Sequence, residues 1–350
     1  MMRMTTSRRR VLGALSGVTG STAWSLPAAA QERRLVANTY PGLWEEAHRL
    51  HLLPAFKRVS GIDATLTPML AVDVIARLAA SRGTPPFDVI LNDEGPFLAN
   101  IDQDFFETLD ASKLPNLADI PQKFIDPTMK GVYVSAQIIG LAYNPARVQT
   151  PPTSWDDLAR PEYRGRVGIT GPGSSLAVAW LVETAKLHGG SEANLEPAFA
   201  QLRKIMPNVG AVTAHPGQLI TLFQQGEIDV SFSYLNLIAP LKARGVPVEL
   251  VKPETGWVLL RNGVQIVKNT RSPQLAHAYV NAYLGREVQA GLAAAPYYLA
   301  PTNTAVPFGG ELQTIGQSMA DLERSVIIDW AKINPQRSAL IERFNRETRA

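Results

Sequence analysis

The side chains best placed to bind a small solute follow two short apolar runs that are predicted to be strands. Tyr40 follows the first of these runs, and Asn92, Asp93 and Glu94 directly follow the run 87–91. The carboxyl ends of parallel strands meet at one edge of a sheet, where α/β proteins build ligand sites. Carboxylates beside aromatic rings suit an alkylammonium group. The alternatives are a turn position for Tyr40 and helix capping for the other three.

A second candidate region is the stretch 153–175, in which a strand predicted over 166–170 leads through a glycine turn into a helix. Ser174 or Ser175 is placed to cap this helix, which the apolar pattern extends to about His188. Because free amides at a helix N-terminus attract anions, either serine could also face a ligand.

Four further candidates lie on predicted strands or at their ends. Ser135 lies on the apolar strand predicted over 131–143, Tyr234 ends another strand, Trp257 precedes a third, and Asn262 lies on it. Trp257 could stack on a bound solute, with core packing as the alternative. These four residues complete the predicted ligand set.

The sequence favours binding over catalysis. It contains no zinc-protease, nucleophile-elbow or phosphate-loop motif. A secreted hydrolase is the weaker alternative, because its candidates, Ser174 or the pair Asp93 and Glu94, have no predicted histidine partner. His48 and His51 lie three residues apart on one predicted helix, where a solvated face is expected, and a metal site would need ligands from elsewhere. No cofactor is predicted.

The order of elements predicts an α/β fold. Helical patterns alternate with buried strands, which is typical of mainly parallel sheets flanked by helices. The chain has 350 residues, and a single core stops growing at roughly 250–300 residues, so two lobes are predicted.

Several segments, in order, resemble the family 1 extracellular solute-binding proteins, the periplasmic binding components of ABC importers for iron(III), polyamines, thiamine and phosphonates. The segments include T-S-W-D-D-L-A-R-P-E-Y-R-G-R-V at 153–167, G-E-I-D-V at 226–230, K-A-R-G-V-P-V-E-L-V-K-P-E-T-G at 242–256 and P-T-N at 301–303. The resemblance extends over about 35–305.

The resemblance implies a two-lobed periplasmic binding protein fold. Each lobe would be a mixed, mainly parallel sheet flanked by helices, and two crossover strands would join them. Lobe 1 would comprise 31–138 and 261–325, lobe 2 would comprise 139–260, and a C-terminal helix in 326–350 is left unassigned. A monomer is expected to close on its solute and deliver it to a membrane permease with an ATPase; a sensory role is the alternative.

Three ligand classes remain open. A polyamine such as putrescine or spermidine is the leading expectation, although relatives that bind polyamines usually have an acid near Asn262. A phosphonate or other anion would use the amides above Ser174. Iron(III) binders of this family typically have adjacent tyrosines where this chain has Ser233 and Tyr234, and its own tyrosine pair falls in the wrong segment, at 297–298.

The N-terminus is predicted to be a twin-arginine export signal. It contains S-R-R-R-V-L at 7–12, a mildly apolar stretch over 11–26 and a small-residue cleavage site at 28–30. The predicted location is therefore the periplasm, with 1–30 removed; an uncleaved anchor is the alternative.

Charge and cysteine content narrow the possible partners. The chain has 34 basic and 31 acidic residues, and four of the arginines but none of the acids lie in 1–30. The remainder therefore has a net charge of −1, which gives no reason to expect nucleic acid or an anionic membrane as a partner. The absence of cysteine excludes disulfides and thiolate chemistry.

Overall fold

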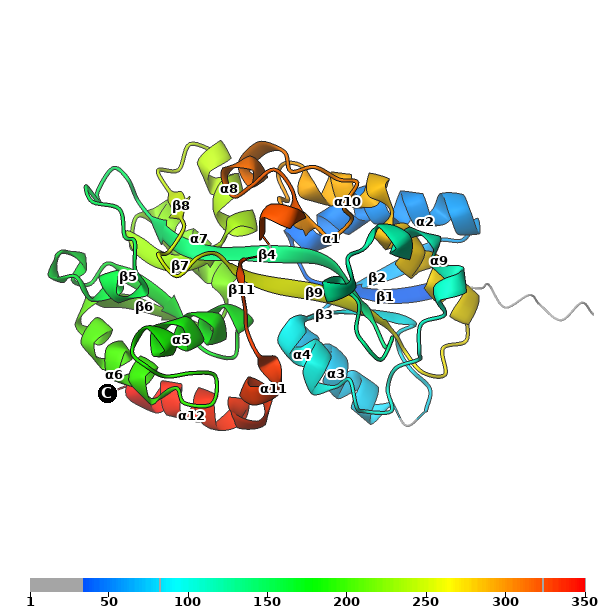
Figure 1. Ribbon diagram of the computed structural model, residues 1–350, viewed down its shortest axis with the longest axis horizontal. Helices are drawn as coiled ribbons and strands as arrows, with labels where there is room; N and C mark the ends of the chain where they lie inside the picture. Colours follow the sequence, from blue (N-terminus) through cyan, green and yellow to red (C-terminus); the bar gives the residue numbers. More distant parts are fainter. Residues whose placement is uncertain (1–33, 82, 323, 350) are drawn as a thin grey trace, which may run out of the picture. The chain divides into compact units, whose positions relative to one another are not determined.

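The computed structural model describes residues 34–81, 83–322 and 324–349 (Figure 1). The predicted export signal and its cleavage site lie outside these residues. Within them, helices and strands alternate as the sequence predicts.

The strands are β1 (Leu35–Thr39), β2 (Ala64–Pro68), β3 (Val89–Asp93), β4 (Val132–Tyr143), β5 (Val167–Thr170), β6 (Val209–Thr213), β7 (Val230–Tyr234), β8 (Glu249–Val251), β9 (Val258–Ile266), β10 (Ala300–Pro301) and β11 (Val326–Ile327). The helices are α1 (Leu43–Ala47), α2 (Leu53–Ser60), α3 (Ala71–Ala80), α4 (Glu94–Ala99), α5 (Ser175–Leu187), α6 (Glu196–Ile205), α7 (Pro216–Gln225), α8 (Leu235–Ala243), α9 (Pro273–Leu284), α10 (Arg286–Ala293), α11 (Trp330–Ile333) and α12 (Arg337–Glu347).

The strands form one continuous sheet in the order β2-β1-β3-β9-β4-β7-β5-β6. The pairs β1–β2 and β1–β3 are parallel at one end of this order, and β5–β6 and β5–β7 are parallel at the other. Between them β9 runs antiparallel to both β3 and β4, and β4 runs antiparallel to β7. The long strands β4 and β9 therefore connect two parallel α/β units (Figure 1).

Two separate hydrophobic cores confirm the predicted two-lobed fold. The first is built around β1, β3, α2 and α9. The second is built around β5, β7, α5 and α6, and in it Trp180 stacks on Phe232 with a centroid distance of 4.8 Å. Every residue of β4 is buried, because this strand passes from one core into the other.

The stretch 153–175 forms as predicted. Ser154 and Asp157 make a capping box around a 3₁₀ helix over Trp155–Ala159. The chain then leaves the helical region ahead of Pro161. Ser174 caps α5, its side chain accepting a hydrogen bond from the amide of Leu176 at 3.2 Å. The start of this long buried helix is thereby fixed at the end of β5.

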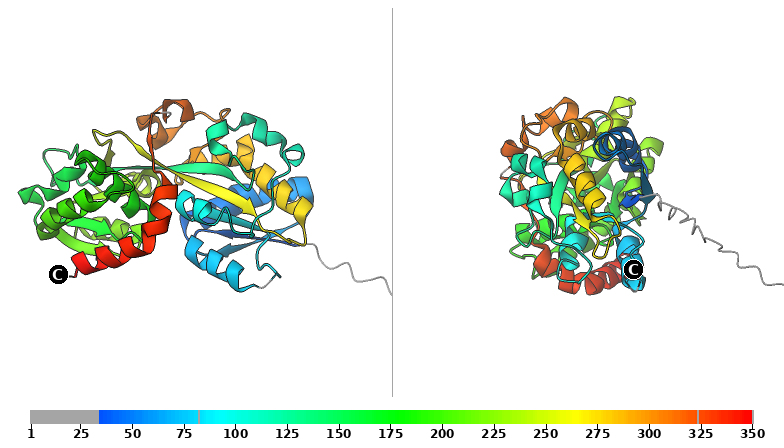
Figure 2. Two further views of the ribbon diagram at one scale, coloured as in Figure 1. Left: turned by 60° about the horizontal axis from the view of Figure 1, so that its bottom comes forward. Right: turned by 90° about the vertical axis from the view of Figure 1, so that its right-hand side faces the viewer.

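The C-terminal segment contains the helix predicted within 326–350. Two 3₁₀ helices, Gly310–Thr314 and Met319–Leu322, precede α11 and α12. Leu340 and Phe344 of α12 belong to the second core, while Trp330 of α11 packs against Gly95 of α4. The tail thus contacts elements of both lobes (Figure 2).

His48 corrects another prediction, because it is buried and not on a solvated helix face. Its ring nitrogens hydrogen-bond to the hydroxyls of Thr39 at 2.7 Å and Tyr283 at 2.6 Å. Burial lowers the pKa of His48 from 6.5 to about 3. The imidazole is a neutral packing element of the first core.

Acidification should lower the free energy of unfolding, because His48 is buried in its neutral form. The unfolded chain protonates His48 below pH 6.5 while the folded protein does not, so the free energy of unfolding should fall between pH 6.5 and about 3. This residue should contribute a slope of up to about 1.4 kcal/mol per pH unit. Urea denaturation at several pH values gives the slope of the unfolding free energy against pH. Compared with the wild type, this slope should be shallower for His48→Gln and unchanged for the surface variant His215→Gln. Equal slopes for the wild type and both variants would show that His48 does not cause the loss of stability.

Candidate solute-binding site

Asp93 ends β3 and is held by residues from two other segments. The hydroxyl of Tyr40 donates to Oδ1 of Asp93 at 2.9 Å and accepts from its backbone amide at 2.8 Å. The amide of Asn262 donates to the same oxygen at 2.9 Å, because the antiparallel register places Asn262 directly opposite Asp93. Three of the predicted ligand residues therefore meet at one carboxylate.

Residues of the second lobe complete this group. Ser175, the first residue of α5, lies close enough to Asp93 to lower the pKa of its carboxyl group. The hydroxyl of Tyr234, at the end of β7, lies at the start of α5, where it interacts with Ser174 and the amide of Leu176. The strand ends of both lobes therefore converge here.

Arg337, the first residue of α12, joins the same group and was not predicted. Its Nη2 donates to the carbonyl oxygen of Gly173 at 3.1 Å, and its Nη1 lies 3.0 Å from the point that a Cβ on Gly95 would occupy. The guanidinium thus lies between the start of α4 and the turn before α5. We call Tyr40, Asp93, Ser174, Ser175, Tyr234, Asn262 and Arg337 the Asp93 cluster.

Burial controls the electrostatics of the Asp93 cluster. Burial raises the pKa of Asp93, against the lowering effect of its hydrogen bonds and of Arg337. Burial also lowers the pKa of Arg337, partly offset by Asp93. Yet no nitrogen–oxygen distance between the two side chains is 4.0 Å or less among the described residues. The cluster therefore contains two opposite charges that influence each other without forming an ion pair.

Three predicted ligand residues are not part of the Asp93 cluster, and two of them have other polar partners. Asn92 is fully buried and donates to Gln265 at 3.2 Å, because it points to the face of β3 opposite Asp93. Glu94 forms a buried ion pair with Arg261. Ser135 is buried on β4, opposite Asn262 in register, and its hydroxyl has no hydrogen-bond partner among the described residues.

Trp257 is not brought into the Asp93 cluster. Its ring packs on Gly140 of β4 and beside Val251, so close that a Cβ at residue 140 would lie 2.6 Å from the indole. This contact supports the core-packing alternative for the tryptophan. Its partial exposure leaves an edge of the ring uncovered.

Comparison with known proteins identifies the chain. The family model described as bacterial extracellular solute-binding protein matches residues 84–334, which is most of the chain. The protein belongs to the bacterial extracellular solute-binding proteins. Members of this family are binding proteins, which confirms the prediction that the chain is not an enzyme.

Individual relatives of this solute-binding protein differ in their ligands. An uncharacterized Haemophilus influenzae protein is 29% identical over 61% of this chain and 63% of its own length. The spermidine/putrescine-binding periplasmic protein 1 of the same organism is 24% identical over 70% of this chain and 69% of its own. A Salmonella typhimurium protein provisionally named for binding 2-aminoethylphosphonate is 24% identical over 67% of this chain and 68% of its own.

Solved structures show the same fold. The structure of an ABC transporter protein from Clostridium perfringens has a TM-score of 0.74 and 24% identity, covering 90% of this chain and 99% of that one. A spermidine/putrescine substrate-binding protein from Streptococcus pneumoniae, solved with calcium and HEPES, has a TM-score of 0.72 and 19% identity, covering 90% of this chain and 99% of that one. These likenesses establish the architecture and leave the ligand open.

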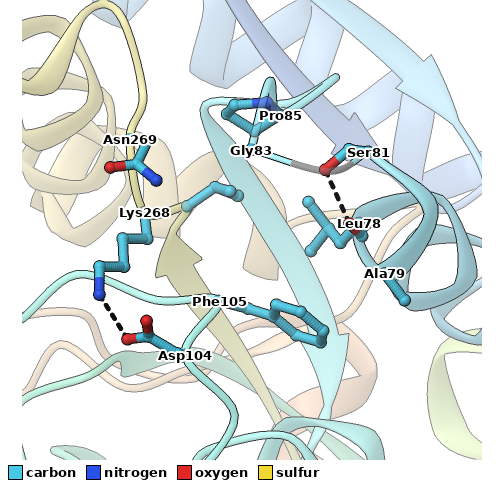
Figure 3. Close-up of a pocket in the computed structure, with 10 residues that line it drawn as sticks. Leu78, Ala79, Ser81, Gly83, Pro85, Asp104, Phe105, Lys268 and Asn269 are labelled. Atoms are coloured by element: carbon cyan, nitrogen blue, oxygen red, sulfur yellow. Dashed lines mark hydrogen bonds and ion pairs between the residues drawn. The ribbon is translucent and has the colours of Figure 1, made fainter.

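Other features of this solute-binding protein lie apart from the Asp93 cluster. Tyr297 and Tyr298 belong to the first core, where Tyr297 donates to Glu46 at 3.0 Å. A surface pocket beside Phe105 and Lys268 contains none of the predicted ligand residues (Figure 3). In the part of the chain that the structure describes, no group of three His, Asp or Glu side chains is arranged to hold a metal ion. No helix there has the length and apolarity to span a bilayer.

Proposed function

We propose that this protein is the solute-binding subunit of an ABC importer and that it captures an amine-bearing solute at the Asp93 cluster. The observation that carries the proposal is the half-buried Asp93 carboxylate, which has no ion-pair partner among the described residues. A buried carboxylate is stabilised by a counter-charge. Its hydrogen-bond partners Tyr40 and Asn262 belong to the first lobe, while Ser175 and Tyr234 approach from the second, which suits a site that closes on its ligand.

The ligand class follows from the chemistry around Asp93. The hydroxyl groups of Tyr40 and Tyr234 converge on the site, and aromatic rings beside a carboxylate suit an alkylammonium group. The names of the Haemophilus influenzae and Salmonella typhimurium relatives, spermidine/putrescine and 2-aminoethylphosphonate, have an amine in common. An ammonium group paired with Asp93 is therefore the shared feature that we assign to the solute.

The two lobes are proposed to hinge about β4 and β9. Residues 31–138 and 261–325 would form one lobe and 139–260 the other; most buried side chains divide between the two cores in this way, while Leu235, Ala239 and Leu259 belong to the first core. Closure would exclude water from the solute and align the surfaces that a membrane permease, coupled to an ATPase, recognises. The protein would be exported to the periplasm and act there as a monomer.

A ligand screen tests this proposal. At least one of putrescine, spermidine and 2-aminoethylphosphonate should raise the melting temperature. A ligand that binds only the native state adds about 2.7 kcal/mol to the free energy of unfolding at 100 times its Kd. Ethylphosphonate and ferric citrate, which have no amine, serve as controls. Stabilisation by a control alone would refute the amine site, and chemical change of a bound solute would refute a binding role.

A further inference from the structure

Arg337 stands out among the arginines of the protein. Among the described residues, five arginines are half-buried: Arg160, Arg166, Arg261, Arg337 and Arg343. The other four each form an ion pair with a carboxylate. Among the residues that the structure describes, no carboxylate lies within 4.0 Å of the Arg337 guanidinium, which donates a hydrogen bond to the carbonyl oxygen of Gly173. A partly buried guanidinium with one such acceptor has donors left for an anion.

The position of this guanidinium is fixed by its surroundings. Arg337 lies over the ring of Trp330, 5.7 Å from the ring centroid. The helix that carries it is anchored to the second core by Phe344, and Arg343 pairs with Glu196 of α6 at 2.7 Å. The helix that carries this charged member of the Asp93 cluster is therefore anchored to the second core.

The start of α5 adds a second source of positive potential. Arg337 binds the carbonyl oxygen of Gly173, two residues before the 13-residue helix α5. The first-turn amides of a helix of this length attract an oxyanion. Across the site, the Asp93 carboxylate has the opposite charge and also lacks an ion-pair partner among the described residues.

We propose that the solute is a small zwitterion whose ammonium group binds Asp93 and whose oxyanion group binds Arg337 and the start of α5. This inference rests on the proposed function, since it takes the Asp93 cluster as the solute site. A diamine would place its second ammonium near Arg337, where like charges repel. Arg337 is therefore the residue that selects a zwitterion over a polyamine of similar length.

Calorimetric titration with matched compounds tests the inference. The wild type should bind 2-aminoethylphosphonate at least about tenfold more tightly than putrescine. Arg337→Gln should weaken binding of 2-aminoethylphosphonate at least about 30-fold, because an oxyanion in the site would lose its charged partner. The same change should leave putrescine binding unchanged or tighter. Arg346→Gln, an exposed position on the same helix, is the control and should change neither affinity.

Further variants and compounds separate the outcomes. Arg337→Lys retains the charge and should recover part of the affinity for 2-aminoethylphosphonate. Such a recovery would show that the loss in Arg337→Gln does not come from misfolding. Taurine and β-alanine distinguish a sulfonate and a carboxylate from a phosphonate. Putrescine binding without binding of any zwitterion would overturn this inference and leave the amine site intact. Failure of every amine to bind the wild type would overturn both.

Discussion

Asp93→Asn is expected to weaken binding of the amine solute by about 30-fold or more without destabilising the free protein. Removing one member of a buried charge pair typically costs about 2–5 kcal/mol of binding free energy. Asparagine keeps the oxygen that accepts from Tyr40 and Asn262. Because burial raises the pKa of Asp93, its charge opposes folding above the usual pKa, and the neutral amide should leave the free protein as stable or more stable.

Two measurements decide this prediction. Calorimetric titration gives the affinity of each variant for the stabilising amine, and urea denaturation gives its free energy of unfolding. Asp63→Asn is the control, because Asp63 is an exposed acid, 73% accessible, paired with Lys57 on the surface. Retention of wild-type affinity by Asp93→Asn would place the amine site elsewhere in the molecule.

Glu94→Ala is expected to destabilise the folded protein by about 3–5 kcal/mol, because it leaves a buried arginine without its counter-ion. The side chain of Glu94 is 1% exposed and that of its partner Arg261 is 15% exposed. The guanidinium also lies over the ring of Tyr133, 4.3 Å from its centroid. The pair connects the first turn of α4 to the crossover strand β9, so its loss should loosen the junction behind the Asp93 cluster.

A double variant separates the loss of the pair from the loss of packing. The double variant Glu94→Ala/Arg261→Met also replaces the unpaired guanidinium with an apolar side chain. It should therefore recover a large part of the free energy of unfolding. Urea denaturation measures both proteins against Glu227→Ala, which removes an exposed carboxylate and should change the free energy of unfolding by less than about 0.5 kcal/mol. A loss below about 1 kcal/mol in Glu94→Ala would show that the pair contributes little.

Much of the Asp93 cluster could be predicted from strand ends alone. Tyr40, Asp93 and Tyr234 each lie at or just after the carboxyl end of a strand, and Ser174 caps the helix after another. The apolar runs that form buried strands also fix where those strands stop. Local sequence therefore locates residues whose place in the site depends on a strand end.

The prediction wrongly grouped Asn92 with Asp93 and missed Arg337. Both results depend on where a side chain points and where the chain runs in the folded protein. The strand predicted over 87–91 continues to Asp93, so Asn92 and Asp93 alternate between opposite faces of the sheet and only one can reach the site. Arg337 follows no strand and reaches the site only because the tail crosses from α4 to the second core. No local pattern in the sequence specifies that path.

The position of α12 at the end of the chain has a consequence for the engineering of ligand preference. The family model matches residues 84–334 and so does not include Arg337. Grafting a different terminal helix onto the two lobes offers a route to chimaeras with altered selectivity that leave the strand-end loops intact.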